Sequence, residues 1–149
     1  MKIVLQRVSE ARVEVNGRTV GEIGIGLVIL LGIAQGDSES EIDWGVNKIC
    51  ELRIFPDSAE KFNRSLEEVG GAVLVVSQFT LFGDIQKGRR PSFIEAAAPE
   101  VAVPLYERFV SGLRNRGITT STGVFGAKMQ VFIVNDGPVT LVIEKKMHN

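Results

Sequence analysis

The sequence predicts an α+β fold in which residues 1–149 form a single domain with barrel-like, mostly antiparallel curved β-sheets and two main helices. Three observations support this fold class. Short apolar or alternating segments, typical of strands, occur at both ends of the chain. Two longer segments have helical spacing. The chain has 149 residues, 44% of them hydrophobic, and is therefore long enough to bury one core.

The start of the chain is typical of strands joined by tight turns. Residues 2–8 are mostly apolar, and residues 11–15 alternate apolar and polar side chains, so we expect two strands there. Asn16-Gly17 predicts a type I′ hairpin turn, because both central residues of that turn have positive φ. We expect the partner strand over residues 19–23. Residues 27–33 are apolar on both faces, which predicts a central strand.

The first predicted helix spans residues 38–53. Ser38 and Glu41 have the spacing of a capping box, in which the two residues satisfy free amides of the first turn. Cys50 lies on the apolar face of this helix, where we expect a small core residue rather than a reactive thiol.

The second predicted helix lies within residues 99–116 and contains Pro104. A proline in a helix interior removes one hydrogen bond and clashes one turn back, at a cost of about 3 kcal/mol. We therefore expect the helix to begin near Ala102 rather than to be kinked at the proline. Gly117 is a suitable residue to end it.

The remaining strands lie in the second half of the chain. Residues 72–76 are apolar and β-branched, residues 128–134 alternate, and residues 139–143 predict a closing strand. We expect a turn at residues 135–138 between the last two strands. So many strands leave sheet edges that need covering, and a homodimer would cover them.

Composition excludes several kinds of site. With Cys50 as the only cysteine, the chain has no internal disulfide framework and no multi-cysteine metal site. The only histidine is His148, in a tail that we expect to fray, so we predict neither a catalytic histidine nor a zinc site. No apolar run reaches the roughly 18 residues of a membrane helix. We expect a cytoplasmic protein without metal or cofactor. Because the formal net charge is −1, any RNA contact must come from a local patch.

Two stretches place polar side chains where an apolar pattern would otherwise continue. Ser77-Gln78-Phe79-Thr80 directly follows the buried strand at residues 72–76. A strand that turns polar at its end brings hydrogen-bonding groups to the edge of a core, which is where binding pockets form. The second stretch is Asn135-Asp136-Gly137-Pro138-Val139-Thr140, near the other end of the chain. Taken singly, each of these residues also fits an ordinary strand end or turn.

Together, the two stretches resemble the two signature motifs of the D-aminoacyl-tRNA deacylases. The likeness extends to Gln6-Arg7-Val8 and to Lys87-Gly88-Arg89-Arg90-Pro91-Ser92-Phe93, and it covers residues 1–143. The resemblance implies a homodimer with a barrel-like core. It also implies hydrolysis of the ester that joins a D-amino acid to the 3′ end of tRNA, without a cofactor.

The resemblance further implies roles for individual residues. A cis Gly137-Pro138 pair of one protomer would reach into the partner's pocket, which contains the catalytic stretch from Ser77 through Gln78 and Phe79 to Thr80. Arg7 and Asn135 would belong to the region that selects the substrate's chirality, with Arg7 buttressing the loop. Phe125 and Met129 would form walls of the pocket for the terminal adenosine, unless they are simply core residues.

The chemistry of these residues suits selection by exclusion. Gly137 has no Cβ, so the backbone can come close to the substrate α-carbon. A proline lowers the cost of a cis bond to about 0.5–1 kcal/mol. An L side chain would then point into the loop, whereas a D side chain would point to solvent. We expect such a site to accept many D-amino acids and also glycine.

Two mechanisms remain open at this point. In one, the Thr80 hydroxyl is the nucleophile, but the sequence offers no obvious base to activate it. In the other, which we favour, the 2′-hydroxyl of the tRNA assists while the amides of Phe79 and Thr80 polarise the ester carbonyl.

Rival functions also remain open. The chain could be a non-catalytic RNA- or protein-binding dimer of the same fold, or an editing enzyme whose main target is glycine mischarged on tRNA. Lys87, Arg89 and Arg90 are candidate phosphate contacts, because binding to a nucleic-acid backbone needs clustered positive charge. The alternative for these three residues is an ordinary solvated loop.

Overall fold

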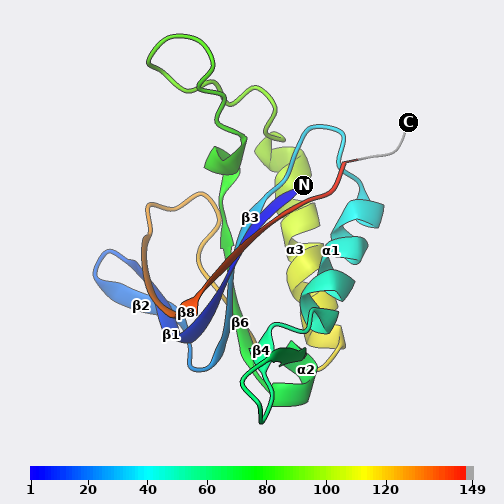
Figure 1. Ribbon diagram of the computed structural model, residues 1–149. Helices are drawn as coiled ribbons and strands as arrows, with labels where there is room; N and C mark the ends of the chain where they lie inside the picture. The colour runs from blue at the N-terminus through cyan, green and yellow to red at the C-terminus, as the bar shows by residue number, and fades with distance from the viewer. Residues whose placement is uncertain (147–149) are drawn as a thin grey trace.

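The chain folds as a curved sheet with two helices packed side by side against one of its faces (Figure 1). A computed structural model describes residues 1–146. The strands and helices, with a short 3-10 helix η1 among them, follow in the order β1 (Lys2–Val15), β2 (Arg18–Ile23), β3 (Gly26–Gly32), α1 (Glu39–Glu51), β4 (Phe55–Pro56), β5 (Phe62–Arg64), α2 (Leu66–Val69), β6 (Ala72–Ser77), η1 (Phe79–Phe82), α3 (Pro99–Asn115), β7 (Thr120–Thr122) and β8 (Gln130–Glu144).

The six-stranded sheet is organised around β1. Its strand order is β2-β1-β3-β6-β7, and β8 also pairs with β1. The pairs that involve β1 are antiparallel, whereas β3–β6 and β6–β7 are parallel. The hydroxyl of Ser121 in β7 donates to the carbonyl of Glu22 in β2 at 3.1 Å, so the two ends of the strand order meet. The prediction of a barrel-like, mostly antiparallel sheet with two main helices is confirmed.

Two glycine-dependent positions fix the first connections. Asn16 and Gly17 have φ values of 52° and 75°, as the predicted type I′ turn requires. Gly26, at the start of β3, lies so close to β6 that a Cβ there would be 1.8 Å from the carbonyl oxygen of Ala72. No other residue fits at that crossing without moving the backbone.

Two of the predicted breaks between strands are wrong. Residues 2–8 and 11–15 belong to one continuous strand, β1, because the polar residues between them fall where the register with β8 shifts and the strand bends. The turn predicted at residues 135–138 is likewise a bulge inside β8, which runs unbroken from Gln130 to Glu144. In both cases a break in the apolar pattern marks an irregularity within a strand rather than its end.

Helix α1 begins as predicted, with both hydrogen bonds of the Ser38–Glu41 capping box in place. The hydrogen bond from the Ser38 side chain lowers the pKa of Glu41. The later start predicted for α3 is wrong. The helix begins at Pro99, where a missing N–H costs nothing. The amides of Val101 and Ala102 both bond to Ala98 O, at 3.0 and 2.9 Å.

Pro104 therefore lies inside α3. The proline faces solvent, as does Glu100 one turn earlier, so water can reach the carbonyl that Pro104 leaves without an amide partner.

Four short elements were not predicted from the sequence: β5, α2, η1 and β7. Between residues 57 and 71 lies α2, with a second capping box formed by Ser65 and Glu68. Each element is three or four residues long, too short for a periodic pattern to appear in the sequence.

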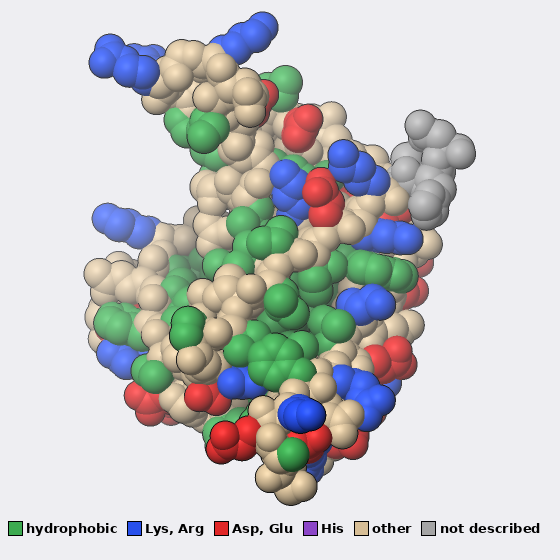
Figure 2. All heavy atoms as spheres, in the orientation of Figure 1, with side chains coloured by type: hydrophobic (Ala, Val, Ile, Leu, Met, Phe, Trp, Pro, Cys, Tyr) green, Lys and Arg blue, Asp and Glu red, His purple; other side chains and the backbone are tan. Residues whose placement is uncertain are grey.

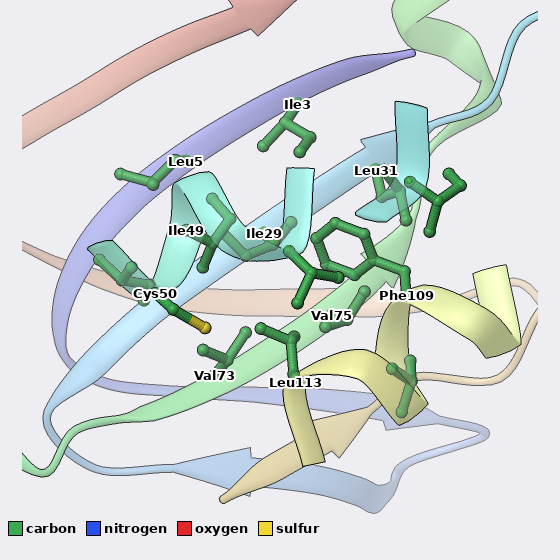
Figure 3. Close-up of a cluster of buried hydrophobic side chains, with 14 of the residues drawn as sticks. Ile3, Leu5, Ile29, Leu31, Ile49, Cys50, Val73, Val75, Phe109 and Leu113 are labelled. Carbon is green, nitrogen blue, oxygen red and sulfur yellow. The ribbon is translucent and has the colours of Figure 1, made fainter. Parts of the chain in front are cut away.

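Apolar side chains cover both faces of the sheet. On the helix-covered face, Phe109 and Leu113 of α3 and Ile49 and Cys50 of α1 pack on β1, β3 and β6 (Figure 3). A smaller cluster on the other face consists of Val8, Ala11, Val13, Ile23, Val28, Leu74 and Val76. In β6, Val73 and Val75 point to one cluster, Leu74 and Val76 to the other. Burial raises the pKa of the Cys50 thiol to about 11, consistent with the expected role as a core residue.

Among residues 1–146, no helix is long and apolar enough to cross a membrane.

Replacing Pro104 with alanine tests the unexpected start of α3. We expect the Pro104→Ala variant to raise the free energy of unfolding by about 2 kcal/mol. The relieved helix penalty of about 3 kcal/mol exceeds the roughly 0.4–1 kcal/mol of added unfolded-chain entropy. Urea denaturation measures the change. Pro99→Ala is the matched control and should bring no gain, because Pro99 occupies the first helical position. Unchanged or lower stability in Pro104→Ala would contradict this account.

Candidate active site

The first sequence motif lies where β6 ends and the chain turns into η1. The amide of Gln78 donates to Leu31 O at 2.8 Å and so extends the sheet by one residue beyond Ser77. The amides of Phe79 and Thr80 precede the first hydrogen bond of η1, from Leu81 N to Gln78 O at 3.2 Å. These two amides therefore have no acceptor within the 3-10 helix.

The Thr80 hydroxyl is exposed and has an amide neighbour. The side-chain nitrogen of Gln78 donates to Thr80 Oγ1. An amide donor cannot remove the hydroxyl proton, so this contact does not activate Thr80 as a nucleophile. The structure thus supplies no base to the Thr80 hydroxyl through that contact.

A cavity of about 440 Å³ adjoins the first motif. Its lining includes Ser77, Gln78 and Phe79 together with Phe125 and Met129. Five predicted site residues from two distant parts of the chain therefore meet at one hollow. An apolar cavity with a few polar groups at its edge is the usual form of a small-molecule site.

Tyr106 of α3 lines the same cavity and was not anticipated as a site residue. Its hydroxyl donates to Val75 O at 3.0 Å, and burial raises its pKa to about 12. The phenol is therefore a protonated donor to the main chain and not a base. Its ring meets the ring of Phe125 edge to face, with centroids 5.7 Å apart, and so positions that cavity wall.

The second motif forms the bulge of β8 opposite Arg7. In the β1–β8 register, Gln6 faces Thr140 while Val8 faces Asn135, so the residues between Asn135 and Thr140 bulge out at Arg7. Val139 turns inward and is buried, whereas Gly137 and Pro138 are exposed at the outer part of the bulge. The Gly137–Pro138 peptide bond is cis. This is the isomer that the resemblance of the motif implies.

The buried side chain of Arg7 supports this bulge. The side chain is buried, with 7% of its surface exposed. Its Nε donates to Asp136 O at 3.1 Å and its Nη1 donates to Ile54 O at 2.8 Å. The guanidinium carbon also lies 5.4 Å from the centroid of the Phe62 ring. Arg7 therefore ties the bulge of β8 to the β4–β5 hairpin, and Ile54 and Phe62 are contacts that sequence reasoning missed.

Asn135 closes the base of the bulge. Its Oδ1 accepts the amide of Val139 at 2.8 Å, and its Nδ2 donates to Thr140 Oγ1 at 3.0 Å. The side-chain amide of Gln6 donates to the same hydroxyl oxygen at 3.2 Å. The first and last residues of the motif are thus bonded to each other, and Gly137 and Pro138 are carried on a short, closed span.

The two motifs do not share one cavity within the described chain. The cavity lined by Ser77, Gln78 and Phe79 does not include Gly137 or Pro138 among its walls. Gly137 has a φ of +137°, and a Cβ there would be 2.7 Å from Val139 Cγ2 and 3.0 Å from Val139 N, so the bulge leaves no room for a larger residue.

The basic residues Lys87, Arg89 and Arg90 are exposed on a loop that projects beyond the sheet (Figures 1 and 2). Two hydrogen bonds between the main chains of Asp84 and Ser92, at 2.7 and 2.9 Å, close the base of this loop. The loop therefore presents positive charge outward on a tethered stem.

No metal centre accompanies these features in the part of the chain that the structure describes. Residues 1–146 contain no group of three or more His, Cys, Asp and Glu side chains that could hold an ion. His148, the candidate that we rejected from the sequence, lies outside the described residues.

Comparison with known proteins gives a consistent result. The profile of a family described as D-Tyr-tRNA(Tyr) deacylase matches residues 4–144. A protein from Desulfatibacillum aliphaticivorans named D-aminoacyl-tRNA deacylase is 57% identical over 146 residues, which is 98% of this chain and 100% of that protein.

Two solved structures share the fold. One, described as c-Myc DNA Unwinding Element Binding Protein, aligns with a TM-score of 0.92 at 41% identity and covers 99% of this chain and 100% of its own. The other, described as a probable eukaryotic D-amino acid tRNA deacylase, aligns with a TM-score of 0.82 over 95% of this chain and 97% of its own. At 21% identity, this second likeness shows the fold alone.

Substitutions at Asn135 test whether this side chain closes the bulge. Asn135→Ala leaves the amide of the buried Val139 without its acceptor, so we expect a loss of about 1–3 kcal/mol in the free energy of unfolding. Chemical denaturation gives the value. Asn135→Asp keeps an acceptor for Val139 and should retain most of the stability. Equal losses in the two variants would show that the bond to Val139 is not the important one.

Proposed function

The chain belongs to the D-Tyr-tRNA(Tyr) deacylase family, and on that premise we propose how it recognises and hydrolyses D-aminoacyl-tRNA. It is a D-aminoacyl-tRNA deacylase, a hydrolase that releases the free D-amino acid and the tRNA. As an editing enzyme of translation it acts in the cytoplasm, as one domain over residues 1–149. The observation that carries the proposal is the separation of the two motifs, a cavity beside Ser77 to Thr80 and an exposed Gly137–Pro138 bulge.

The site is completed by a second protomer. The exposed Gly137–Pro138 bulge of one chain enters the cavity beside Ser77 to Thr80 of its partner, and the reverse contact completes the second site. Exchange of the same element in both directions is the rule for a two-fold symmetric interface. The long strand β8 is bonded only to β1 among the described strands, and Val142 in it is 73% exposed, which leaves apolar surface for a partner.

Selection acts by exclusion at the main chain. Carbonyl groups of the bulge hold the substrate ammonium, and Gly137, having no Cβ, brings the backbone against the α-carbon. An L side chain would collide with this wall, whereas a D side chain points to solvent. Arg7 and Asn135 keep the wall in place through the hydrogen bonds that join Asp136, Val139 and Thr140. Glycine lacks a side chain and is accepted.

Hydrolysis relies on main-chain donors and on the RNA. The ester carbonyl oxygen binds the free amides of Phe79 and Thr80, which stabilise the negative charge that develops there. Water attacks the carbonyl carbon, the bond to the ribose oxygen breaks, and that oxygen takes up a proton, with the neighbouring 2′-hydroxyl assisting the transfer. Phe125 and Met129 hold the terminal adenosine in the cavity. The contact of Thr80 with an amide rather than a base favours this mechanism over a threonine nucleophile.

The loop with Lys87, Arg89 and Arg90 contacts the phosphates of the acceptor end. Its exposed cations are suited to binding that does not depend on sequence and weakens with salt. The relative described as a DNA unwinding element binding protein favours a second candidate, a nucleic-acid-binding dimer without catalysis.

A deacylation assay with three substrates separates these functions. We expect rapid release of D-tyrosine from D-tyrosyl-tRNA, hydrolysis of glycyl-tRNA, and no release from L-tyrosyl-tRNA above the uncatalysed rate. Binding without hydrolysis of any substrate would support the non-catalytic candidate. Hydrolysis of glycyl-tRNA far above D-tyrosyl-tRNA would make mischarged glycine the main target. Hydrolysis of the L substrate would contradict exclusion by the bulge.

The Thr80→Ala variant separates the two mechanisms. We expect kcat within about tenfold of the wild type, because the amide donors remain while the hydroxyl is lost, and one such donor is worth about 2.7–4 kcal/mol. Single-turnover kinetics with D-tyrosyl-tRNA measure the effect, and Thr80→Ser is the matched control. Complete loss of turnover in Thr80→Ala, with an intact fold and full activity in Thr80→Ser, would establish the hydroxyl as the nucleophile instead.

A further inference from the structure

Phe93 connects the cavity to the basic loop, and the proposed function gives it no role. It lines the cavity together with Phe79, Phe125 and Met129, and it directly follows Ser92, the residue that closes the stem of the loop. Phe93 is 36% exposed, so part of its ring is open to solvent, and the neighbouring Phe79 is 57% exposed.

The Phe93 ring is held in a fixed position. It meets the ring of Phe79 edge to face, with centroids 5.2 Å apart and planes at 73°. Gly83 allows this approach, since a Cβ there would be 3.0 Å from Phe93 Cε1. An aromatic ring that is fixed by its neighbours and remains partly open to solvent loses little conformational freedom when it binds a flat ligand.

The charges on the loop that precedes Phe93 favour a nucleic-acid ligand. Lys87, Arg89 and Arg90 are exposed on the loop that ends at Ser92. The nearby Asp84 carboxylate accepts the amide of Gln86 at 2.9 Å, within the loop itself. Clustered cations and an exposed aromatic ring on one loop are a combination that proteins use for single-stranded nucleic acid, with phosphates on the cations and bases stacked on the ring.

We propose that Phe93 is a stacking platform for the unpaired nucleotide that precedes the terminal adenosine of the tRNA. The inference rests on the proposed function, in which the adenosine occupies the cavity. The base before it stacks on Phe93, and the phosphates run toward Arg90 and Arg89. Stacking does not depend on the identity of the base, so the subsite accepts any tRNA end.

The test compares a full substrate with a truncated one. D-tyrosyl-tRNA has the preceding nucleotide, whereas the D-tyrosyl ester of adenosine does not. In Phe93→Leu we expect KM for D-tyrosyl-tRNA to rise about tenfold, within the range for loss of one stacked base. The rise for the adenosine ester should be several-fold smaller. Phe93→Trp, which keeps an aromatic face, should restore KM for the tRNA.

Val20→Ala is the control, because Val20 is 43% exposed and lies on β2, away from the cavity walls and from β8. It should change neither KM. Equal losses on both substrates in Phe93→Leu would overturn the proposal and show that Phe93 only shapes the cavity or contacts the second protomer. A wild-type protein that hydrolyses neither substrate would refute the proposed function instead. Full activity on both substrates in Phe93→Leu would refute the stacking subsite alone.

Discussion

One buried cation determines how the second motif is presented. Arg7 donates to Ile54 O and to Asp136 O, so a single side chain of β1 joins the segment before β4 to the bulge of β8. A hydrogen bond from a charged group contributes about 1.5–3 kcal/mol, and a buried cation without such bonds would be costly. The position of Gly137 is therefore set by the core of the protein. In the proposed function this bulge is the wall that rejects one enantiomer, and Arg7 would supply the stiffness that such a wall needs.

Much of the fold follows from local pattern. The alternation in β6, where Val73 and Val75 face one cluster and Leu74 and Val76 the other, is visible in the sequence as an apolar run with a strand's length. The turn at Asn16-Gly17 and the cap at Ser38 depend on residues next to each other, and both were predicted correctly. The cavity could be predicted only in part. Phe125 and Met129 line it together with Ser77 because the fold brings them there, and no local spacing in the sequence indicates this.

The remaining features depend on contacts between distant residues. Ile54 O is 47 residues from Arg7, and nothing near Arg7 indicates that partner. The bulge in β8 appears in the sequence as a turn, because Gly137-Pro138 has turn chemistry whether or not the strand continues beyond it. The late start predicted for α3 was wrong for the same reason. A local rule about proline in helix interiors could not show that Pro104 lies on the side of α3 that faces solvent. A pattern describes a residue's preference, whereas the outcome depends on which neighbours the fold supplies.

In the proposed site, catalysis and chiral selection both depend on main-chain groups, and this has a chemical consequence. If the ester carbonyl is bound by the amides of Phe79 and Thr80 and chirality is judged at the main chain of Gly137, no side chain reads the amino acid. Broad acceptance of D-amino acids then follows from the same geometry that rejects L-amino acids. Affinity must come from the other half of the substrate, which is the RNA. The exposed cations and the aromatic rings near the cavity are the surfaces available for that purpose. The enzyme would thus recognise its substrate mainly as a tRNA end and examine the amino acid only for its handedness.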